Sequence, residues 1–408
     1  MSLDKKIELL APAGNFEKLE IAIHYGADAV YVGGKNFSLR NFSGNFSEKE
    51  LEEAIVFAHR HNVKIYVTCN IYPRNHDILP LKDFLARVAK MDPDAIIVAD
   101  PGVFMLAKAE APHIDIHLST QANTTNIGSV RFWKQIGAKR INLARELSLS
   151  EIREISESCD IEIEAFVHGA MCISYSGRCL LSSFMTMRDS NRGMCSHPCR
   201  WNYAVVEQSR KDQYYPIAED SRGTYIFNSK DLCMIHHIPE MISSGIDSLK
   251  IEGRMKGIHY LASAVKIYRE ALDTFYAAPD AYQVKPWWKE ELAKIGFREF
   301  CTGFYFGDPS QAVPFYDADQ TINYQLFAGK ILGKINKTRA LVEIRNKVFK
   351  GAPVQLLPKK GPPREDVIVE IVSAHGEKLD FAQPGSLVNI DFTGECHANE
   401  LVRKKSDQ

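Results

Sequence analysis

Short apolar runs rich in isoleucine and valine recur along the first 252 residues, and amphipathic stretches lie between most of them. Runs of this length and composition are typical of parallel strands that are buried on both faces. They predict strands at Ile7–Ala11, Ala29–Gly33, Lys64–Asn70, Ala95–Asp100, Ile114–Thr120, Arg140–Ala144, Ile161–Val167 and Ser248–Glu252. Eight strand-then-helix units predict an α/β fold in which the parallel sheet closes into a (β/α)8, TIM-like barrel.

Two of the predicted helices begin with capping boxes, Ser47-x-x-Glu50 and Ser148-x-x-Glu151. About eighty residues separate the seventh and eighth predicted strands, which is far more than separates any other neighbouring pair. This gap predicts a cysteine-rich insertion at 169–235, which leaves the C-terminal end of the seventh strand.

The hydrophobic pattern changes after a long amphipathic helix at Ile258–Tyr276. We expect the barrel to occupy 1–285, a linker rich in proline and aromatic residues to occupy 286–323, and a second domain to occupy 324–408. The second domain shows short strand patterns joined by turn residues, which predicts a small antiparallel β-barrel. Its predicted strands are Leu326–Ile335, Ala340–Phe349, Val354–Leu357, Val367–Val372, Leu379–Phe381 and Leu387–Phe392.

Polar residues follow the C-terminal ends of most of the predicted barrel strands, where (β/α)8 enzymes hold their active sites. Any one of them could be a loop cap or a salt-bridge partner. Together they predict a polar pocket that favours anions and faces the cysteines. Our hypothesis is that the cations of this pocket bind a small dicarboxylate. The predicted binding residues are Arg40, Asn70, Asp100, Gln121, Asn123, Arg145, Lys250 and Arg254.

The seventh strand alternates with a period of two, which directs Glu162, Glu164, Phe166 and His168 into the barrel. A carboxylate in that position needs a partner or a raised pKa. Glu164 is therefore either a structural partner of Lys250 or Arg254, or a catalytic acid or base. We take Glu164, His168 and Glu252 as the candidate catalytic residues.

Composition adds little to this interpretation. The chain has 408 residues, 45% of them hydrophobic, and a formal net charge of −1, so it has no overall basic character that would indicate nucleic acid. The N-terminal MSLDKKIELL lacks the apolar run of a signal peptide, and no eighteen-residue apolar stretch exists. We expect a cytoplasmic protein with no membrane contact.

Residues 330–360 form a local exception, because they contain nine lysines and arginines against one acid, Glu343. Such a run is either a solvated face or a surface for the phosphate backbone of RNA. The residues that we expect to bind RNA are Lys337, Arg339, Arg345, Lys347 and Lys350.

The insertion is dense in cysteine, with Cys172, Cys179, Cys195 and Cys199, and Cys233 follows soon after. Disulfides are disfavoured in the cytosol. A zinc site at Cys195-x3-Cys199 would lack a second close pair of ligands. Irregular spacing over about sixty residues suits an iron–sulfur cluster best. The remaining cysteines are scattered and are expected to be structural thiols: Cys69, Cys159, Cys301 and Cys396.

The segment Glu164–Ser182, EAFVHGAMCISYSGRCLLS, resembles the signature of the family catalogued as peptidase U-32. Further similar segments are LAPAGNFEKLEIAIHYGADAVYVGG, NRGMCSHPCRW, NSKDLC, SLKIEGRMK and FCTGFYFG, so the resemblance covers residues 8 to 307. Within the family the chain looks most like members that hydroxylate tRNA. The resemblance implies oxygen-independent hydroxylation of uridine at C5 in the wobble position of tRNA, with prephenate as co-substrate.

The resemblance also implies a 4Fe-4S cluster held by Cys172, Cys179, Cys195 and Cys233, with Cys199 in reserve because relatives differ in the cysteines they use. Two other interpretations stay open. One is a collagenase-like peptidase, as the family label says. The other is an RNA-binding or assembly factor that contains structural zinc.

Overall fold

The computed structural model describes residues 6–38, 44–171, 174–196, 198, 218–220, 223–225, 231–296, 300–307 and 325–405. These residues fall into two compact units. The first unit contains the strands and most of the helices between Glu8 and Lys256, together with residues 300–307. The second unit contains residues 20–26, 257–296 and 325–405 of the described chain.

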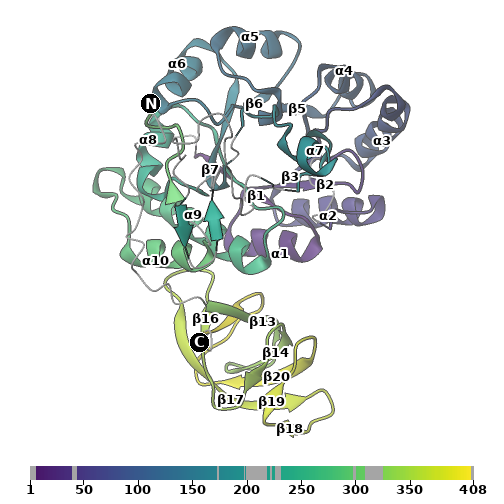
Figure 1. The fold of residues 1–408 in the computed structure, drawn as a ribbon. Helices are drawn as coiled ribbons and strands as arrows, with labels where there is room; N and C mark the ends of the chain where they lie inside the picture. The colour runs from purple at the N-terminus through teal and green to yellow at the C-terminus, as the bar shows by residue number, and fades with distance from the viewer. Residues whose placement is uncertain are drawn as a thin grey trace, which may run out of the picture. The chain divides into compact units, whose positions relative to one another are not determined.

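The first unit is a closed parallel barrel, as the apolar runs predict (Figure 1). All eight predicted barrel strands are present, and each pairs in parallel with the next, while the last pairs with both the first and the seventh. They are β1 (Glu8–Pro12), β2 (Ala29–Gly33), β3 (Lys64–Cys69), β4 (Ala95–Val98), β5 (Asp115–Leu118), β6 (Arg140–Asn142), β7 (Glu162–Ala170) and β11 (Ser248–Ile251).

Helices alternate with these strands along the chain, and Figure 1 shows several of them outside the strands. They are α1 (Phe16–Tyr25), α2 (Glu48–Arg60), α3 (Ile78–Met91), α4 (Pro101–Glu110), α5 (Ile127–Gln135), α6 (Leu149–Ser158) and α8 (Ile238–Ser243). Both predicted capping boxes are confirmed, with Ser47 and Glu50 at the start of α2 and Ser148 and Glu151 at the start of α6. Short 3-10 turns also lie in this unit, at η1 (Asn75–Asp77), η2 (Thr120–Ala122) and η5 (Ile235–His237).

The interior of the barrel is apolar in one layer and ionic in another. Leu10, Ala29, Tyr31, Tyr66, Ala95 and Ile97 form a buried cluster that closes the interior. A carboxylate from β1, Glu8, pairs with Arg140 from β6, and both side chains are at most 11% exposed. Burial alone would raise the pKa of Glu8, but Arg140, with hydrogen bonds from Tyr66 and Ser248, lowers it.

The insertion begins at the end of β7, which extends beyond the barrel. β7 runs to Ala170, three residues beyond the predicted end, because β10 (Asp231–Cys233) pairs antiparallel with its last residues. β12 (Phe300–Cys301) continues the sheet beyond β10. The described insertion also contains α7 (Leu181–Thr186), η3 (Ser190–Arg192), β8 (Ala218–Asp220) and β9 (Gly223–Tyr225).

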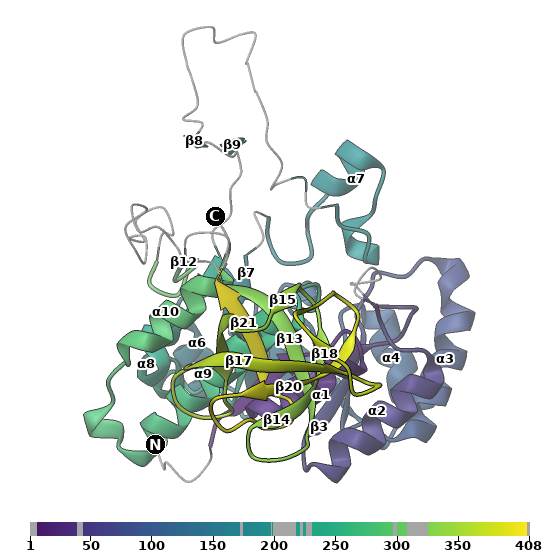
Figure 2. The ribbon, with the colours of Figure 1, turned by 90° about the horizontal axis from the view of Figure 1, so that it is seen from below.

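The second unit contains a closed six-stranded antiparallel barrel, which confirms the predicted fold of the C-terminal part (Figure 2). Neighbouring strands follow the order β16 (Pro353–Leu357), β21 (Leu401–Lys405), β13 (Gln325–Lys334), β14 (Arg339–Ile344), β20 (Leu387–Phe392) and β17 (Arg364–Ser373). β17 also pairs with β16, which closes the barrel around a core of isoleucine, valine and leucine.

Sequence patterns place most of these strands but miss others. The predicted strand Ala340–Phe349 is two strands, β14 and β15 (Val348–Phe349), and Leu379–Phe381 is divided between β18 (Lys378–Leu379) and β19 (Phe381–Ala382). Strand β21 lies between β13 and β16 and was not predicted, because its residues LVRKK read as a charged tail.

Helices complete the second unit. The predicted amphipathic helix is α9 (Ile258–Ala277), and the 3-10 turn η6 (Pro279–Ala281) follows it. The stretch that was expected to be a linker begins instead with a helix, α10 (Pro286–Ile295). Its proline stands at the first helical turn, where proline is tolerated, and Trp288 is fully buried.

Candidate active site

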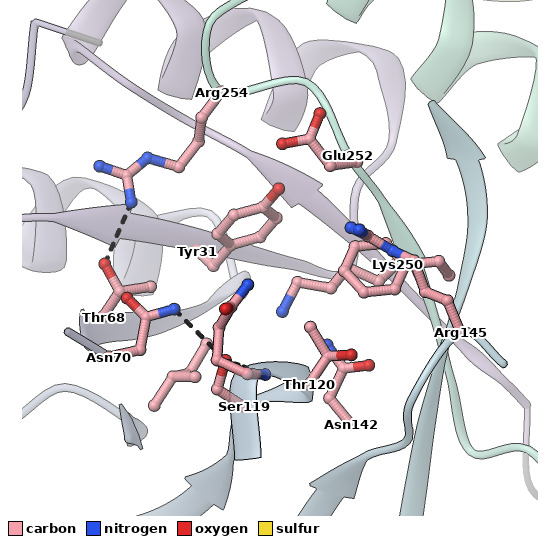
Figure 3. Close-up of a pocket in the computed structure, with 13 residues that line it drawn as sticks. Tyr31, Thr68, Asn70, Ser119, Thr120, Asn142, Arg145, Lys250, Glu252 and Arg254 are labelled. Carbon is pink, nitrogen blue, oxygen red and sulfur yellow. Dashed lines mark hydrogen bonds between the residues drawn. The ribbon is translucent and has the colours of Figure 1, made fainter. Parts of the chain in front are cut away.

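A pocket lies at the C-terminal ends of the barrel strands, where the sequence predicts the site (Figure 3). The empty space between its lining atoms, including the part open to solvent, is about 500 Å³. Nearly every barrel strand, or the loop that follows it, contributes to the lining. The lining residues are Tyr31, Thr68, Asn70, Ile97, Ser119, Thr120, Gln121, Asn142, Arg145, Phe166, Lys250, Glu252 and Arg254.

Lys250 lies at the inner end of this pocket and is paired with Glu164. Its ammonium is 2.7 Å from Glu164 Oε1, and the two side chains are 7% and 2% exposed. Arg140 Nη1 lies 3.7 Å from the other Glu164 oxygen. Glu164 is therefore a buried carboxylate paired with cations, which is the first of the two interpretations that the sequence leaves open.

Two aromatic rings line the cationic side of the pocket. The Lys250 ammonium is 4.5 Å from the centre of the Tyr31 ring, and the Arg145 guanidinium is 4.0 Å from the centre of the Phe166 ring. Such stacking fixes the plane of a guanidinium without neutralising its charge. Arg145 Nε is buried and has no hydrogen-bond acceptor in the described part of the chain.

Three neutral groups accept hydrogen bonds from Arg254. It donates to Ser38 Oγ at 2.6 Å, to Thr68 Oγ1 at 3.1 Å and to Asn45 Oδ1. A side chain at Gly33 would collide with its guanidinium, so the glycine that ends β2 is required for this arrangement. Sequence reasoning did not find Ser38, Asn45 or Thr68. Serine, asparagine and threonine are common in loops, so nothing in their pattern marks them.

The structure separates the predicted binding residues into three groups. Asn70, Gln121, Arg145, Lys250 and Arg254 line the pocket. Asp100 instead caps α4 by accepting from the backbone N–H of Val103, and Asn123 ends η2 in the left-handed conformation. Arg40 lies outside the described residues. Among the candidate catalytic residues, Glu252 lines this pocket, while Glu164 and His168 do not.

His168 lies near the end of β7, behind the pocket. It is fully buried, it is the cross-strand partner of Cys233, and its ring meets that of Phe300 at 5.3 Å. Burial, together with the nearby charge of Lys256, lowers the pKa of His168 to about 3. Its imidazole is therefore neutral at physiological pH.

The first part of the insertion docks on the rim of this pocket. Ser176 donates from its backbone N–H to Glu146 at 2.8 Å, and its hydroxyl lies 3.4 Å from that of Thr120. Gly177 has φ of +73° and lies against the carbonyl of Gln121, where a side chain would collide. The described start of the insertion therefore packs against the C-terminal end of the barrel, where the insertion is predicted to lie.

A second contact ties the insertion to the loop after β3. Arg192 makes two hydrogen bonds to Asp77, at 2.6 and 3.1 Å. The hydrogen bond from Arg192 lowers the pKa of Asp77 to about 2. Next to this pair, the backbone N–H of Tyr72 donates to the carbonyl of Asn191 at 3.1 Å. Arg192 therefore acts as an anchor for the insertion.

Three of the candidate cluster cysteines lie in the described part of the chain. Cys179 and Cys195 are half-buried in the insertion, and Cys233 is fully buried at the end of β10. Cys172 and Cys199 lie outside the described residues. Within the described chain no three His, Cys, Asp or Glu side chains gather as a metal site. The predicted ligand set therefore stays a prediction.

Hydrogen bonds nevertheless bring together the loops that carry Cys179 and Cys195. The Cys179 carbonyl accepts from Ser190 Oγ at 2.8 Å, and the backbone N–H of Ser196, next to Cys195, donates to Ser182 Oγ at 3.0 Å. These thiols sit in irregular backbone on separate segments, as cluster ligands commonly do. In this respect the residues present fit a cluster.

Several cations of the basic run at 330–360 are paired with carboxylates in the folded second unit, so its surface carries less positive charge than the sequence indicates. Arg339 pairs with Asp391, and Arg345 pairs with Glu343. Lys330 and Lys334 pair with Glu20 and Glu395. The cations that form no ion pair with the described chain include three of the predicted RNA-binding residues, Lys337, Lys347 and Lys350.

Fold and site together define a (β/α)8-barrel protein with a small-molecule pocket under a cysteine-bearing insertion. The family model described as peptidase family U32 matches residues 14–313, and that of the peptidase family U32 C-terminal domain matches residues 323–403. The chain belongs to peptidase family U32.

Curated relatives align with most of the chain. It is 41% identical to "tRNA hydroxylation protein P1" of Bacillus subtilis, over 98% of this chain and 96% of that protein. It is 38% identical to "tRNA hydroxylation protein P" of Escherichia coli, over 93% and 92%. It is also 36% identical to "23S rRNA 5-hydroxycytidine C2501 synthase" of Escherichia coli, over 66% of this chain and 39% of that protein. Among the helices of the described chain, none is long and apolar enough to cross a membrane.

Proposed function

We propose that this protein is an RNA-modifying enzyme that hydroxylates uridine at C5 in the wobble position of tRNA, without molecular oxygen and with prephenate as co-substrate. The observation that carries the proposal is the similarity to tRNA hydroxylation proteins along nearly the whole chain, at 41% identity for one of them. The pocket at the barrel mouth supports it, because it offers cationic groups to a small anion beside an exposed rim.

Arg145 is the principal anion-binding residue in this proposal. Its guanidinium lines the pocket, stacks on Phe166 and forms no ion pair with a carboxylate of the described chain. A planar guanidinium binds a carboxylate through two parallel hydrogen bonds. Arg254 lines the same pocket, so a compound with two carboxylates can be held at both ends. Prephenate is such a dicarboxylate.

Glu252 is the candidate proton acceptor. Replacing hydrogen with a hydroxyl group at C5 of uridine is a two-electron oxidation in which the C5 hydrogen leaves as a proton. This proposal assigns the oxygen atom and the oxidising equivalents to the prephenate co-substrate. Glu252 lines the pocket. Glu164 lies outside the pocket lining and is ion-paired with Lys250 and Arg140. Glu164 therefore acts as a positioning residue, which holds the Lys250 ammonium at the inner end of the pocket.

The cluster in this proposal is a 4Fe-4S group held by Cys172, Cys179, Cys195 and Cys233, with Cys199 as the replacement ligand. Such a cluster supplies one-electron redox chemistry. Hydrogen bonds hold the segments that carry three of these cysteines: Ser190 donates to the Cys179 carbonyl, Ser182 Oγ accepts from the backbone N–H next to Cys195, and β10 pairs with β7 at Cys233.

The second unit contributes RNA binding through Lys337, Lys347 and Lys350, whose charges are not neutralised within the described chain. The peptidase interpretation has less support. Ser176, the serine that precedes Gly177, hydrogen-bonds to the carboxylate of Glu146 rather than to a histidine base. A serine nucleophile is normally activated by a neighbouring base such as histidine.

The test is mass spectrometry of the nucleosides in tRNA from a strain that lacks the gene. We expect 5-hydroxyuridine and its derivatives to be absent, to return with the wild-type gene, and to stay low with Arg145→Ala. Identical modified nucleosides in the parent and the deletion strain would overturn the proposal. Release of peptides from denatured collagen by the purified wild-type protein would favour the peptidase, which a metal-binding or catalytic cysteine would have to carry.

A further inference from the structure

An exposed pair of phenylalanines distinguishes one face of the second unit. Strands β15 and β19 form a two-stranded antiparallel sheet in which Val348 pairs with Ala382 and Phe349 pairs with Phe381. Side chains alternate between the two faces of a strand. Val348 and Ala382 are both 2% exposed and belong to the barrel core, whereas Phe349 and Phe381 are 46% and 42% exposed.

These rings form a joint surface with a lysine. The two ring centroids are 6.2 Å apart, at an interplanar angle of 54°. The Lys347 ammonium lies 4.8 Å from the centre of the Phe349 ring and 4.2 Å from that of Phe381. We call the set of Lys347, Phe349 and Phe381 the aromatic platform.

Two lysines at the platform, Lys347 and Lys350, provide positive charge that can attract an anion. Lys350 is exposed one residue after Phe349, and neither it nor Lys347 forms an ion pair with a carboxylate in the described chain. The acids nearest in sequence are Asp380, Glu343 and Glu377, and Glu343 is paired with Arg345. Two lysines that form no ion pair in the described chain therefore stand beside two solvent-exposed rings.

Proteins that bind single-stranded nucleic acid combine these same elements: aromatic rings for the bases and cations for the phosphates. We infer that the aromatic platform binds unpaired nucleotides of the RNA substrate, with bases stacked on Phe349 and Phe381 and phosphates next to Lys347 and Lys350. This inference rests on the proposed function, because it takes RNA as the substrate. It adds a base-contacting site in a unit for which the basic run predicts contacts to phosphate alone.

Stacking and phosphate contacts have different dependences on salt, and the test uses this difference. The double variant Phe349→Ala/Phe381→Ala should bind tRNA at least roughly thirtyfold more weakly, the lower limit expected for the loss of two base stacks. Its slope of log Kd against log salt should equal that of the wild type, because no counterion contact is lost. Lys347→Met should instead reduce that slope by about 0.7, the value for one single-strand phosphate.

Two matched controls separate the platform from general surface effects. Phe132→Ala removes a 53% exposed phenylalanine from α5, and Lys49→Met removes an exposed lysine from α2. Both should leave the affinity for tRNA and its salt slope unchanged. A short uridine oligonucleotide and a blunt RNA duplex are the probes for strandedness. The double variant should lose affinity for the oligonucleotide and retain that for the duplex.

Phe381→Trp keeps the inference testable if the double variant fails to fold. Its added fluorescence, relative to the wild type, should be quenched by the uridine oligonucleotide. Unchanged tRNA affinity in the folded double variant, or no quenching in Phe381→Trp, would overturn the inference. Binding of wild type to anionic phosphatidylglycerol vesicles, lost in the double variant while tRNA affinity holds, would also overturn it and assign the platform to a membrane surface.

These outcomes are distinguishable from failure of the proposed function. If the wild type restores 5-hydroxyuridine to a deletion strain but the double variant binds tRNA normally, the platform is wrong and the proposed function stands. If the wild type restores no modified nucleoside, the proposed function fails whatever the platform variants show.

Discussion

The Lys250 ammonium lies 2.7 Å from a carboxylate oxygen of Glu164 inside the barrel, and neither side chain is more than 7% exposed. Either charge alone would be strongly destabilising inside the barrel, because it would be buried without an opposite charge. Each side chain of the pair therefore keeps the other in place. The pair thereby fixes a cation at the inner end of the pocket, where Lys250 also lies over the Tyr31 ring.

Removing one member of this pair should destabilise the protein more than removing both. Glu164→Gln or Lys250→Met should each lower the free energy of unfolding by about 3–5 kcal/mol, because an unpaired charge stays buried. The double variant should recover much of this loss. Urea unfolding of all four proteins measures the cycle. If Glu164→Gln retains full stability but has no activity, Glu164 is a catalytic residue rather than a positioning residue.

Arg145 should control the use of the small anion. Arg145→Ala should raise the KM for prephenate roughly tenfold or more, which corresponds to the loss of a charge-assisted hydrogen bond. Arg145→Lys should recover part of the effect, since it keeps the charge without the planar donor pair. The control is Arg87→Ala, on the outer helix α3. Equal KM values for Arg145→Ala and wild type would remove Arg145 from the binding site.

Serine substitutions should separate the cluster ligands from the structural thiols. Cys179→Ser, Cys195→Ser and Cys233→Ser should each lower iron content and visible absorbance in anaerobically reconstituted protein. Cys159→Ser, at a buried thiol that follows α6, should leave both unchanged. Full iron content in Cys233→Ser would show that Cys233 is not a ligand, and Cys199 would then be the fourth ligand. A colourless protein with stoichiometric zinc, even after anaerobic reconstitution, would support the zinc-containing factor.

Lys266, on α9, should make stability depend on pH. Its side chain is 1% exposed, Nζ has no hydrogen-bond partner in the described chain, and burial lowers its pKa from 10.5 to about 8. The folded state therefore disfavours the charged form, and the unfolded state binds more protons between pH 8 and 10.5. The cost of this charge is present in full below pH 8 and disappears as the pH rises through that window.

Lys266→Met should therefore raise the free energy of unfolding at pH 7 by about 3 kcal/mol at most, with the two proteins converging near pH 10.5. Chemical denaturation of both proteins from pH 7 to 10.5 measures the difference. A variant that is less stable at pH 7, with a difference independent of pH, would mean that contacts such as that between Lys266 and the Trp287 ring outweigh the burial of its charge.

Sequence periodicity was sufficient for the barrel, because each strand carries its own apolar run and the strands follow in order. It failed where pairing depends on distant residues. β10 and β12 have three and two residues and exist as strands because they extend β7. β21 contains Arg403, which is fully buried because Glu291 of α10 accepts a hydrogen bond from it. No local pattern in LVRKK indicates that partner.

The candidate site shows the same division. Strand ends indicated Arg145, Lys250 and Arg254 because position in a (β/α)8 barrel implies proximity. The run at 330–360 overstates the positive charge of this surface, because only the charged residues within one contiguous stretch of sequence were counted. Asp391 and Glu395 come from elsewhere in the fold and neutralise Arg339 and Lys334. Folding pairs charges across strands, and the residues between 330 and 360 do not reveal those partners.

The most direct test of the central claim is an anaerobic reaction of the purified, iron-reconstituted protein with a tRNA transcript and prephenate. Mass spectrometry of the digested tRNA measures whether uridine in the wobble position gains one oxygen atom. We predict that this product forms only when cluster, prephenate and wobble uridine are all present, and that Arg145→Ala strongly reduces it. Product formation that requires molecular oxygen, or that proceeds equally without prephenate, would contradict the account.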